Sequence, residues 1–503
     1  MTTCIASARR PAKLRPRQTE FWKPLADYSG EFDPAHPREP EQQRPLFRIF
    51  PMRLNLQISS PSVPALLFII LLTSVGSARA EHWPGWRGPR GDGTSKETGL
   101  PLTWSPTQNI IWKTPLGNYS MSSPIVWRDR VFVTGQTGRG PSMPDRLPAG
   151  NSAAGVVARS PKHSIAFYVS AFSAADGSTL WTQGVDPGKK LIPVADRHNL
   201  AMPTPVTDGS RIYTLFGTGV VTCFTTKGEG LWQRRLEEDY APFDIIWGHG
   251  SSPILNGNLL YIVADHGIGS YVIALDKRNG RTVWKHDRDG IGPSYSTPIL
   301  ANFGSGKELI VTMSYHVRSL DPKSGALNWQ SPGLLRVPIP SPIRSGQLLI
   351  ASGGVRNGPV LALKPPSFSA GSANPRAQPK VIWSKKNTSP YVSSSLSHEG
   401  LLYYFDDDGI AECAEADTGT LLWKARLGGT FTGSPVLAEG NIYAINEDGD
   451  TFVIETGREF KLISQNELGQ RTLASPAISG GRIFIRTDNF LYCIGSPVEP
   501  DND

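Results

Sequence analysis

The hydrophobic and polar positions between Ser251 and Trp284 form four short segments separated by turn residues. Branched and aromatic side chains fill 252–255, 259–263, 271–275 and 282–285, a composition typical of β-strands. The separating Gly, Asn and Asp residues tolerate the positive φ angles of tight turns. A unit of four strands has two open edges and is not stable alone, so this stretch predicts copies of itself.

The copies are present along the chain. Each begins with Ser or Thr, then Pro and an apolar residue, at Ser123, Thr204, Ser252, Thr297, Ser341, Ser434 and Ser475, and without the Pro at Ser394. Most end in Gly-x-x-x-Trp, at Trp181, Trp232, Trp284, Trp329 and Trp423, with Trp383 after a longer turn and Lys461 where the next Trp is expected. A period of roughly 40–50 residues with four strands per repeat indicates a β-propeller.

The repeat count predicts how the ring closes. Eight openings are followed by seven endings, because the last unit stops after three strands, at Ile494. The missing ending precedes the first opening, at 109–113, with Trp112 in the tryptophan position. We therefore predict an all-β fold, an eight-bladed propeller of four-stranded antiparallel blades whose N-terminal strand completes the last blade. Such closure removes the free edges.

The chain resembles the PQQ-repeat, quinoprotein-like family of eight-bladed propellers. The family's motif Ala-x-Asp-x-x-Thr-Gly-x-x-x-Trp is matched by Ala274 to Trp284, apart from Asn279 in place of Thr. The opening Trp83 to Pro89 is similar to the start of secreted PQQ-like propellers of planctomycete-type bacteria. The resemblance implies that Trp112, Trp181, Trp232, Trp284, Trp329, Trp383 and Trp423 dock one blade onto the next. It extends to the propeller subunit of the outer-membrane β-barrel assembly machinery and to quinone-dependent dehydrogenases.

Segments of different composition precede and follow the propeller, which we place at 109–495. Residues 1–51 are Pro- and Arg-rich without periodicity, and we interpret them as a disordered or mis-annotated extension. Residues 52–80 carry an apolar run and an Ala-Arg-Ala end, which predicts a signal peptide cleaved after Ala80 and a periplasmic or secreted protein. Residues 81–108 form a Gly/Pro/Trp-rich strap, and 496–503 a tail.

Charge and cysteine usage narrow the function classes. The formal net charge is +7 over 503 residues, but 9 Lys and Arg and 6 Asp and Glu lie before Met52. Arg53 and Arg79 lie in the predicted signal peptide, which leaves the mature chain at about +2 and gives no argument for nucleic acid. Cys223, Cys413 and Cys493 occupy the third-strand position of Ala274, so we expect small core residues and no disulfide.

Candidate binding residues come from the loops that a propeller brings to one face. Connections that lead into first strands, and loops between second and third strands, open on the same side, and loops on rigid scaffolds often carry function. We expect a funnel there that binds a polar or anionic group, lined by Arg197, His198, Asn199, His249, His266, Tyr295, His316, Arg336, Arg356, Tyr391 and Arg471. The alternative is that these groups only satisfy hydrogen bonds between blades, because buried polar groups require partners.

Neither a metal site nor a catalytic residue is predicted. The histidines come from different blades without ligand spacing, and 406–409 and 446–450 resemble only fragments of calcium loops. The family's dehydrogenases hold PQQ on a Trp floor under a vicinal Cys-Cys disulfide, with calcium and a catalytic Asp. This chain has no Cys-Cys pair.

Two functions stay open from the sequence. The first is an exported, non-catalytic, monomeric scaffold without a cofactor, which binds a protein or a polar small-molecule or glycan partner in the cell envelope and spans no membrane after cleavage. The alternative is a PQQ-dependent dehydrogenase that holds PQQ and calcium in the funnel.

Overall fold

The computed structural model describes residues 80–117, 120–138, 165–188, 191, 194, 198–245, 247–288, 292–353, 356, 358–367, 377–386 and 390–496. The predicted extension, the signal peptide up to Arg79, most of the tail and most of the insertions at 136–164 and 365–379 lie outside these residues. No helix in the described part of the chain is long and apolar enough to cross a bilayer.

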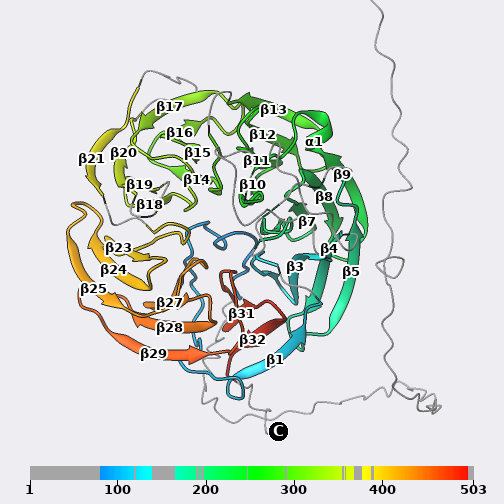
Figure 1. The fold of residues 1–503 in the computed structure, drawn as a ribbon, viewed down its shortest axis with the longest axis vertical. Coiled ribbons are helices and arrows are strands. Elements are labelled where there is room, and N and C mark those ends of the chain that lie inside the picture. The colour runs from blue at the N-terminus through cyan, green and yellow to red at the C-terminus, as the bar shows by residue number, and fades with distance from the viewer. Residues whose placement is uncertain are drawn as a thin grey trace, which may run out of the picture. The chain divides into compact units, whose positions relative to one another are not determined.

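The described residues form eight four-stranded antiparallel sheets set around one axis (Figure 1). This confirms the predicted fold class. The strands of blades one to four, in chain order within each blade, are β2 Ile125–Trp127, β3 Arg130–Thr137, β4 Ala166–Ser173 and β5 Thr179–Val185; β6 Val206–Thr207, β7 Arg211–Leu215, β8 Val220–Thr225 and β9 Gly230–Arg235; β10 Ile254–Asn256, β11 Leu259–Ala264, β12 Tyr271–Asp276 and β13 Thr282–Asp287; β14 Ile299–Asn302, β15 Lys307–Met313, β16 His316–Leu320 and β17 Leu327–Pro332.

Blades five to eight follow the same meander. Their strands are β18 Ile343–Ser345, β19 Leu348–Ser352, β20 Val360–Lys364 and β21 Lys380–Lys385; β22 Leu396–His398, β23 Leu401–Phe405, β24 Ile410–Glu415 and β25 Leu421–Arg426; β26 Val436–Ala438, β27 Asn441–Ile445, β28 Asp450–Glu455 and β29 Leu462–Glu467; β30 Ala477–Ser479, β31 Arg482–Arg486, β32 Phe490–Ile494 and β1 Ile110–Pro115. One short helix, α1 Leu236–Asp239, follows blade two in the described chain.

Blade eight combines the two ends of the propeller. β1 pairs antiparallel with β32, with Trp112 opposite Cys493 and Thr114 opposite Leu491, and in Figure 1 the N-terminal strand lies beside the C-terminal one. The predicted ring closure is therefore confirmed. It gives the edge of β32 a partner that no other strand supplies.

A row of three side chains across each blade builds the core. In blade three, Tyr261 on the second strand lies opposite Ala274 on the third, and Ala274 lies opposite Trp284 on the fourth. Cysteines take the place of Ala274 in three blades, opposite Trp232, Trp423 and Trp112. All three thiols are buried and free, and burial raises their pKa, that of Cys413 to about 11. They are the small core residues that the sequence predicts.

The tryptophan of this row packs on the next blade. The Trp284 indole lies over Gly325 of blade four, where an added Cβ would be 2.5 Å from Cε3. Its Nε1 donates to the carbonyl of Pro322 at 3.1 Å. Trp112, Trp181, Trp232, Trp383 and Trp423 donate in the same way to a carbonyl in the following blade.

Trp329 differs from the other docking tryptophans. The third-to-fourth-strand turn of blade five carries the insertion at 365–379 in place of the short Asp-x-x-x-Gly turn. Nε1 of Trp329 donates instead to Oε2 of Glu308 in its own blade, at 2.7 Å, and Ser319 donates to the same oxygen at 2.5 Å. Burial raises the pKa of Glu308, although both hydrogen bonds oppose this shift.

In blade seven a tryptophan of the strap packs where the repeat lacks its own. The expectation that Lys461 holds the docking position of this blade is wrong, because Lys461 lies before β29. Ser464 stands at that position, opposite Val453, which is itself opposite Tyr443. The Trp104 ring from the strap stacks near Tyr443, with 6.4 Å between ring centroids, and Trp104 is buried. The strap therefore supplies the aromatic ring that the repeat lacks in this blade.

Candidate functional site

Hydroxyl groups of the strand openings form a ring around the propeller axis. The opening Ser or Thr of one blade accepts a hydrogen bond from the backbone N–H of the opening residue of the preceding blade. Seven such bonds of 2.8–3.0 Å link the described blades, including the one from Ser475 back to Ser123. The repeated opening motif thus ties the first strands together at the centre.

The strap passes across one end of this ring, as the blue trace in the middle of Figure 1 shows. Trp83 bridges to Val126 of blade one, and Gly93 accepts from Leu437 of blade seven at 2.9 Å. Nε1 of Trp86 donates to Oγ of Ser341 at 2.9 Å. The strap therefore connects blades that are distant in sequence. We call the side that it covers the strap face and the opposite side the loop face.

Arg87 of the strap is buried near the axis. Its guanidinium donates to the carbonyls of Ser394 at 3.1 Å, Ser395 at 2.6 Å and Asp92 at 2.5 Å. Burial lowers the pKa of Arg87 to about 10, while the Asp92 charge acts in the opposite direction. The charge is thus held by backbone dipoles, and it anchors the strap to blade six.

The two candidate histidines of blade three lie inside the loop face. The ring of Phe243 separates them, with its centroid 5.1 Å from that of His249 and 5.1 Å from that of His266. Burial lowers the pKa of His249 to about 3, with His266 adding to the shift, and the pKa of His266 to about 4. Among the described residues, neither nitrogen of the His266 ring has a hydrogen-bond partner. Both imidazoles are neutral and closed off from a ligand that approaches from solvent.

A buried ion pair stands next to these histidines. Nη2 of Arg288 lies 2.9 Å from Oδ2 of Asp265, and both side chains are fully buried. Burial raises the pKa of Asp265 to about 6, against the opposing effects of Arg288 and Arg318. Arg288 favours the ionised form of Asp265, whereas burial opposes it. Because both side chains are closed off from solvent, the pair is not placed to act on a substrate.

The other candidates on the loop face divide into buried and exposed groups. Tyr295 and Asn199 are buried, His198 lies edge-on to Trp247 at 6.0 Å between centroids, and Arg197 falls outside the described residues. His316 and Tyr391 are half-buried, and Arg336, Arg356 and Arg471 are exposed.

Two of the exposed arginines are engaged by carboxylates. Arg356 lies 3.1 Å from Asp408 of blade six, and Arg471 lies 3.1 Å from Asp488 of blade eight. The candidates thus do not lie together: His249 and His266 pack on Phe243 in the interior, Tyr295 is buried beside Gly250, and the arginines are exposed.

Exposed apolar side chains accompany the polar ones on the loop face. Trp247 is 39% exposed, Ile268 96%, Tyr315 54% and Leu335 41%. They lie in connections into first strands or in second-to-third-strand loops of blades three to five. We call these four residues the apolar loop surface. None of these four residues is among the sequence-based candidates, although the loop Gly267-Ile268-Gly269 carries a signal, an isolated apolar residue between two glycines.

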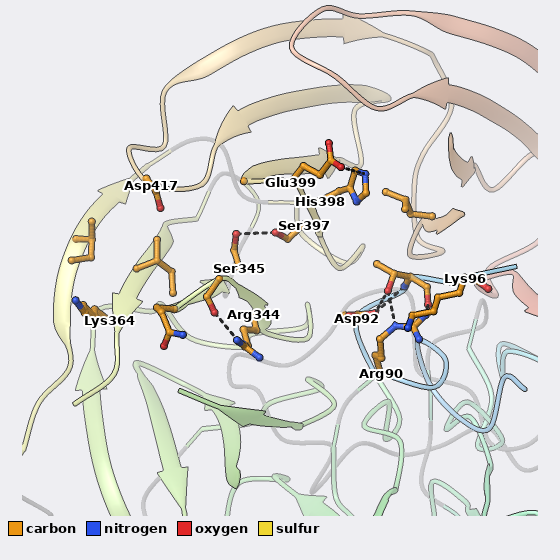
Figure 2. A pocket seen from close by; sticks show the side chains of 18 residues that line it. Arg90, Asp92, Lys96, Arg344, Ser345, Lys364, Ser397, His398, Glu399 and Asp417 are labelled. Carbon is orange, nitrogen blue, oxygen red and sulfur yellow. Dashed lines mark hydrogen bonds and ion pairs between the residues drawn. The ribbon is translucent and has the colours of Figure 1, made fainter. Parts of the chain in front are cut away.

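A pocket of about 920 Å³ opens on the strap face (Figure 2). Strap residues 90–96 form one wall, the β18–β19 hairpin at 344–348 a second, and the β22–β23 hairpin at 397–400 a third. Oγ of Ser397 donates to Oγ of Ser345 at 2.8 Å, which joins the two hairpins. We call this cavity the strap pocket. None of the sequence-based candidates lines it, because those came from loops of the opposite face.

The residues that the structure describes do not reproduce the quinone site of the family's dehydrogenases. The three described cysteines lie in separate blades, and the indoles at the six regular docking positions are hydrogen-bonded between blades. In the described part of the chain, no three His, Cys, Asp or Glu side chains are grouped to hold a metal ion. No reaction step through PQQ can be derived from these residues.

Comparisons with known proteins place the chain among propellers. A family model described as outer membrane protein assembly factor BamB matches residues 166–355 and 372–489, more than half of the chain. The outer membrane protein assembly factor BamB of Legionella pneumophila (strain Paris) is 27% identical over 111 residues, which are 22% of this chain and 28% of that protein. The chain thus matches little more than a quarter of the length of this curated relative.

Solved structures share the fold at low sequence identity. The quinohemoprotein alcohol dehydrogenase ADHIIG from Pseudomonas putida HK5 is 11% identical with a TM-score of 0.57, over 84% of this chain and 82% of that one. The computationally designed Ika8 protein is 11% identical with a TM-score of 0.50, over 77% of this chain and 100% of that one. At this identity the similarity shows the propeller fold alone.

Proposed function

The chain belongs to the family of PQQ-repeat propellers described as outer membrane protein assembly factor BamB, and we propose that it is an exported, non-catalytic propeller that binds a protein partner in the cell envelope. The apolar loop surface is the observation that carries this proposal. Loops on a rigid scaffold often carry binding residues, and aromatic residues are enriched at the centre of interfaces. The name of the Legionella relative, an outer membrane assembly factor, agrees with a partner in that compartment.

Local geometry presents two of these side chains together. The N–H of Tyr315 donates to the carbonyl of Leu335 at 3.1 Å, and the N–H of Gly333 donates to the carbonyl of Tyr315 at 3.1 Å. Tyr315 has a φ of 70°, a conformation that is uncommon for a residue other than glycine. The two backbone hydrogen bonds hold Tyr315 in this conformation and join the segments that carry the exposed phenol ring and the exposed leucine, which suits a fixed contact with a partner.

Charges around the apolar loop surface favour specificity. Arg336 follows Leu335 in sequence, is exposed, and has no ion-pair partner among the described residues. A cation at the rim of an apolar patch selects for partners with a complementary acidic group and accelerates their encounter. His316 and Arg336 therefore remain candidate contact residues in this proposal.

The rigid fold explains how such a surface would act without catalysis. The ring of opening hydroxyls, the docking tryptophans and the β1–β32 closure fix the blades relative to one another. A surface that is already ordered loses little conformational entropy when it binds. The partner can then be held in a defined position, which is the role of a scaffold.

Export places the proposed scaffold where its partner is. We propose that residues 52–80 are removed as a signal peptide, so that the mature chain begins with Glu81. The carbonyl of Glu81 accepts a hydrogen bond from Ser479 at 2.6 Å, and its carboxylate binds Arg90 at 2.6 Å. Cleavage at this bond would retain the first contacts of the strap with blade eight.

Site-specific crosslinking in the envelope of the producing bacterium tests the proposal. A photoreactive amino acid at position 268 should form one dominant crosslink to an envelope protein, and the same amino acid at Lys227, exposed in the third-to-fourth-strand turn of blade two, should not. Tyr315→Asn, which tolerates the positive φ, should weaken the crosslink because it removes the phenol ring. Equal crosslinking from both positions, or none from 268, contradicts the proposal.

A reconstitution assay separates the scaffold from the dehydrogenase alternative. Purified mature protein is mixed with PQQ and calcium and assayed with alcohols and sugars and a dye as electron acceptor. We expect no substrate-dependent reduction of the dye. Turnover that requires PQQ would overturn the non-catalytic part of the proposal.

A further inference from the structure

The strap pocket carries charged groups of both signs on opposite sides. Figure 2 shows Arg344 and Lys364 of blade five along one side and Glu399 and Asp417 of blade six along the other. In the described part of the chain, the Arg344 guanidinium makes one hydrogen bond, from its Nε to the carbonyl of Gly346 at 2.7 Å. Among the described residues, neither Lys364 nor Asp417 has an ion-pair partner. Oε1 of Glu399 lies 3.9 Å from Nε2 of His398, which also lines the pocket. The side chains of Arg344, Lys364 and Asp417 are exposed and available to a ligand.

Neutral hydrogen-bonding groups fill the space between the two charged sides. The hairpin turns bring Gly346, Gln347 and Gly400 to the cavity, and the Ser397–Ser345 hydrogen bond crosses between the hairpins. The described lining contains no Phe, Tyr or Trp on which a sugar ring could stack. Amide and hydroxyl groups flanked by opposite charges complement a peptide backbone better than a neutral glycan.

From this arrangement we propose that the strap pocket is a binding site for a short peptide with free chain ends. The terminal carboxylate lies toward Arg344 and Lys364, and the terminal ammonium group lies toward Glu399 and Asp417. A cavity of about 920 Å³ falls in the size range of small-molecule sites. The site lies on the opposite face from the apolar loop surface, so it is independent of the proposed scaffold function.

The strap is part of this site. Arg90, Asp92 and Lys96 close the pocket on the strap side, and Arg90 is held in position by its ion pair with Glu81 at 2.6 Å. Oδ1 of Asp92 accepts from the backbone N–H of Thr94 at 2.9 Å, which fixes the turn of the strap at the pocket. The pocket thus exists only when the strap is docked on blades five and six.

Tetra-alanine with free ends, its N-acetylated form and its C-amidated form test the proposal by calorimetric titration of the mature protein. Exposed ion pairs are individually weak, so we expect N-acetylation and C-amidation each to reduce the affinity of the peptide by about three- to fivefold. Replacing Arg344 and Lys364 by Gln should remove the effect of amidation but keep that of acetylation. Replacing Glu399 and Asp417 by Asn or Gln should do the reverse. Lys227→Gln, which removes an exposed charge in blade two, should behave as wild type.

Hydrogen exchange locates the bound peptide. Free-ended tetra-alanine should slow amide exchange in the hairpins at 344–348 and 397–400 more than elsewhere. The proposal is overturned if the N-acetylated and the C-amidated peptides bind as tightly as the free one, if protection falls on other blades, or if no binding is detected up to on the order of 10 mM. Because these variants alter only exposed side chains, unchanged melting temperatures show that they remain folded. Crosslinking from position 268 is unaffected by any of these outcomes.

Discussion

Mutating the contact between Trp284 and Gly325 is the most direct test of how the blades are held together. Trp284 is 8% exposed and fills the space above Gly325, and Nε1 bonds the carbonyl of Pro322. Trp284→Ala should cost about 3–5 kcal/mol of unfolding free energy, as for other large truncations in a core. This value includes the cost of leaving the Pro322 carbonyl without its hydrogen-bond donor.

Gly325→Ala attacks the same contact from the other side. The new Cβ would lie 2.5 Å from Cε3 and 2.7 Å from Cδ2 of Trp284, well inside the 3.5–4.0 Å of a normal carbon contact. Overpacking of this kind costs about 1–3 kcal/mol. The φ of +74° adds about 1–2 kcal/mol for any residue with a Cβ.

A double-mutant cycle separates the two terms. In the Trp284→Ala background the overpacking disappears, so Gly325→Ala should cost only about 1–2 kcal/mol, and the coupling energy should be about 1–3 kcal/mol. Gly257→Ala is the matched control, since its φ is +56° and no atom lies within 4 Å of the added Cβ. Urea unfolding followed by circular dichroism measures all four variants. A cost of Gly325→Ala that agrees in both backgrounds within about 0.5 kcal/mol would refute the docking contact.

Four further predictions follow from the same structure. Deleting 109–113 removes most of β1 and exposes the edge of β32, so the protein should aggregate in size-exclusion chromatography; a monomer with unchanged melting would contradict the closure. Trp104→Ala should destabilise the protein by about 3–5 kcal/mol in urea, like loss of a blade's own docking tryptophan, whereas a cost below about 1 kcal/mol would show that the strap ring is dispensable. Histidines in the unfolded chain titrate near pH 6.5, whereas His249 and His266 in the folded protein have pKa values of about 3 and 4. Between about pH 6.5 and 4 the unfolded state therefore binds more protons, and the unfolding free energy should fall as the pH is lowered through this range. His266→Phe should reduce the slope of unfolding free energy against pH by up to about 1.4 kcal/mol per pH unit. The raised pKa of Asp265 contributes a slope of opposite sign, but it is present in both the wild type and the variant and does not affect their difference. Intact mass of the exported protein should correspond to a chain that begins at Glu81, and retention of Ala80 and earlier residues would rule out the predicted cleavage.

The repeat, the blade count and the closure of the ring could be predicted from sequence because each depends on local patterns. Strand alternation and turn residues set the register within one blade, over about 40–50 residues, and a strand missing at one end with a spare one at the other implies closure. The same local logic placed Cys223, Cys413 and Cys493 in the core. Each stands at the position where the third strand faces a tryptophan.

Position in the repeat did not decide what each side chain does. Trp329 has the docking spacing but bonds Glu308, because the neighbouring turn carries an insertion. Trp104 has no repeat position but packs beside Tyr443. Both outcomes depend on which carbonyl or cavity the next blade offers, and that blade is tens of residues away.

The sites show the same division. Loop position groups His249 and His266 with the other candidates, but only packing against Phe243 shows that they are buried and neutral. The strap pocket could not be predicted, because its walls come from three segments about 50 and 250 residues apart that meet across blade boundaries. Sequence alone thus determined the repeating unit and its number. The tertiary structure decided which polar groups reach solvent and which distant turns share a cavity, because burial and proximity are properties of the assembled ring.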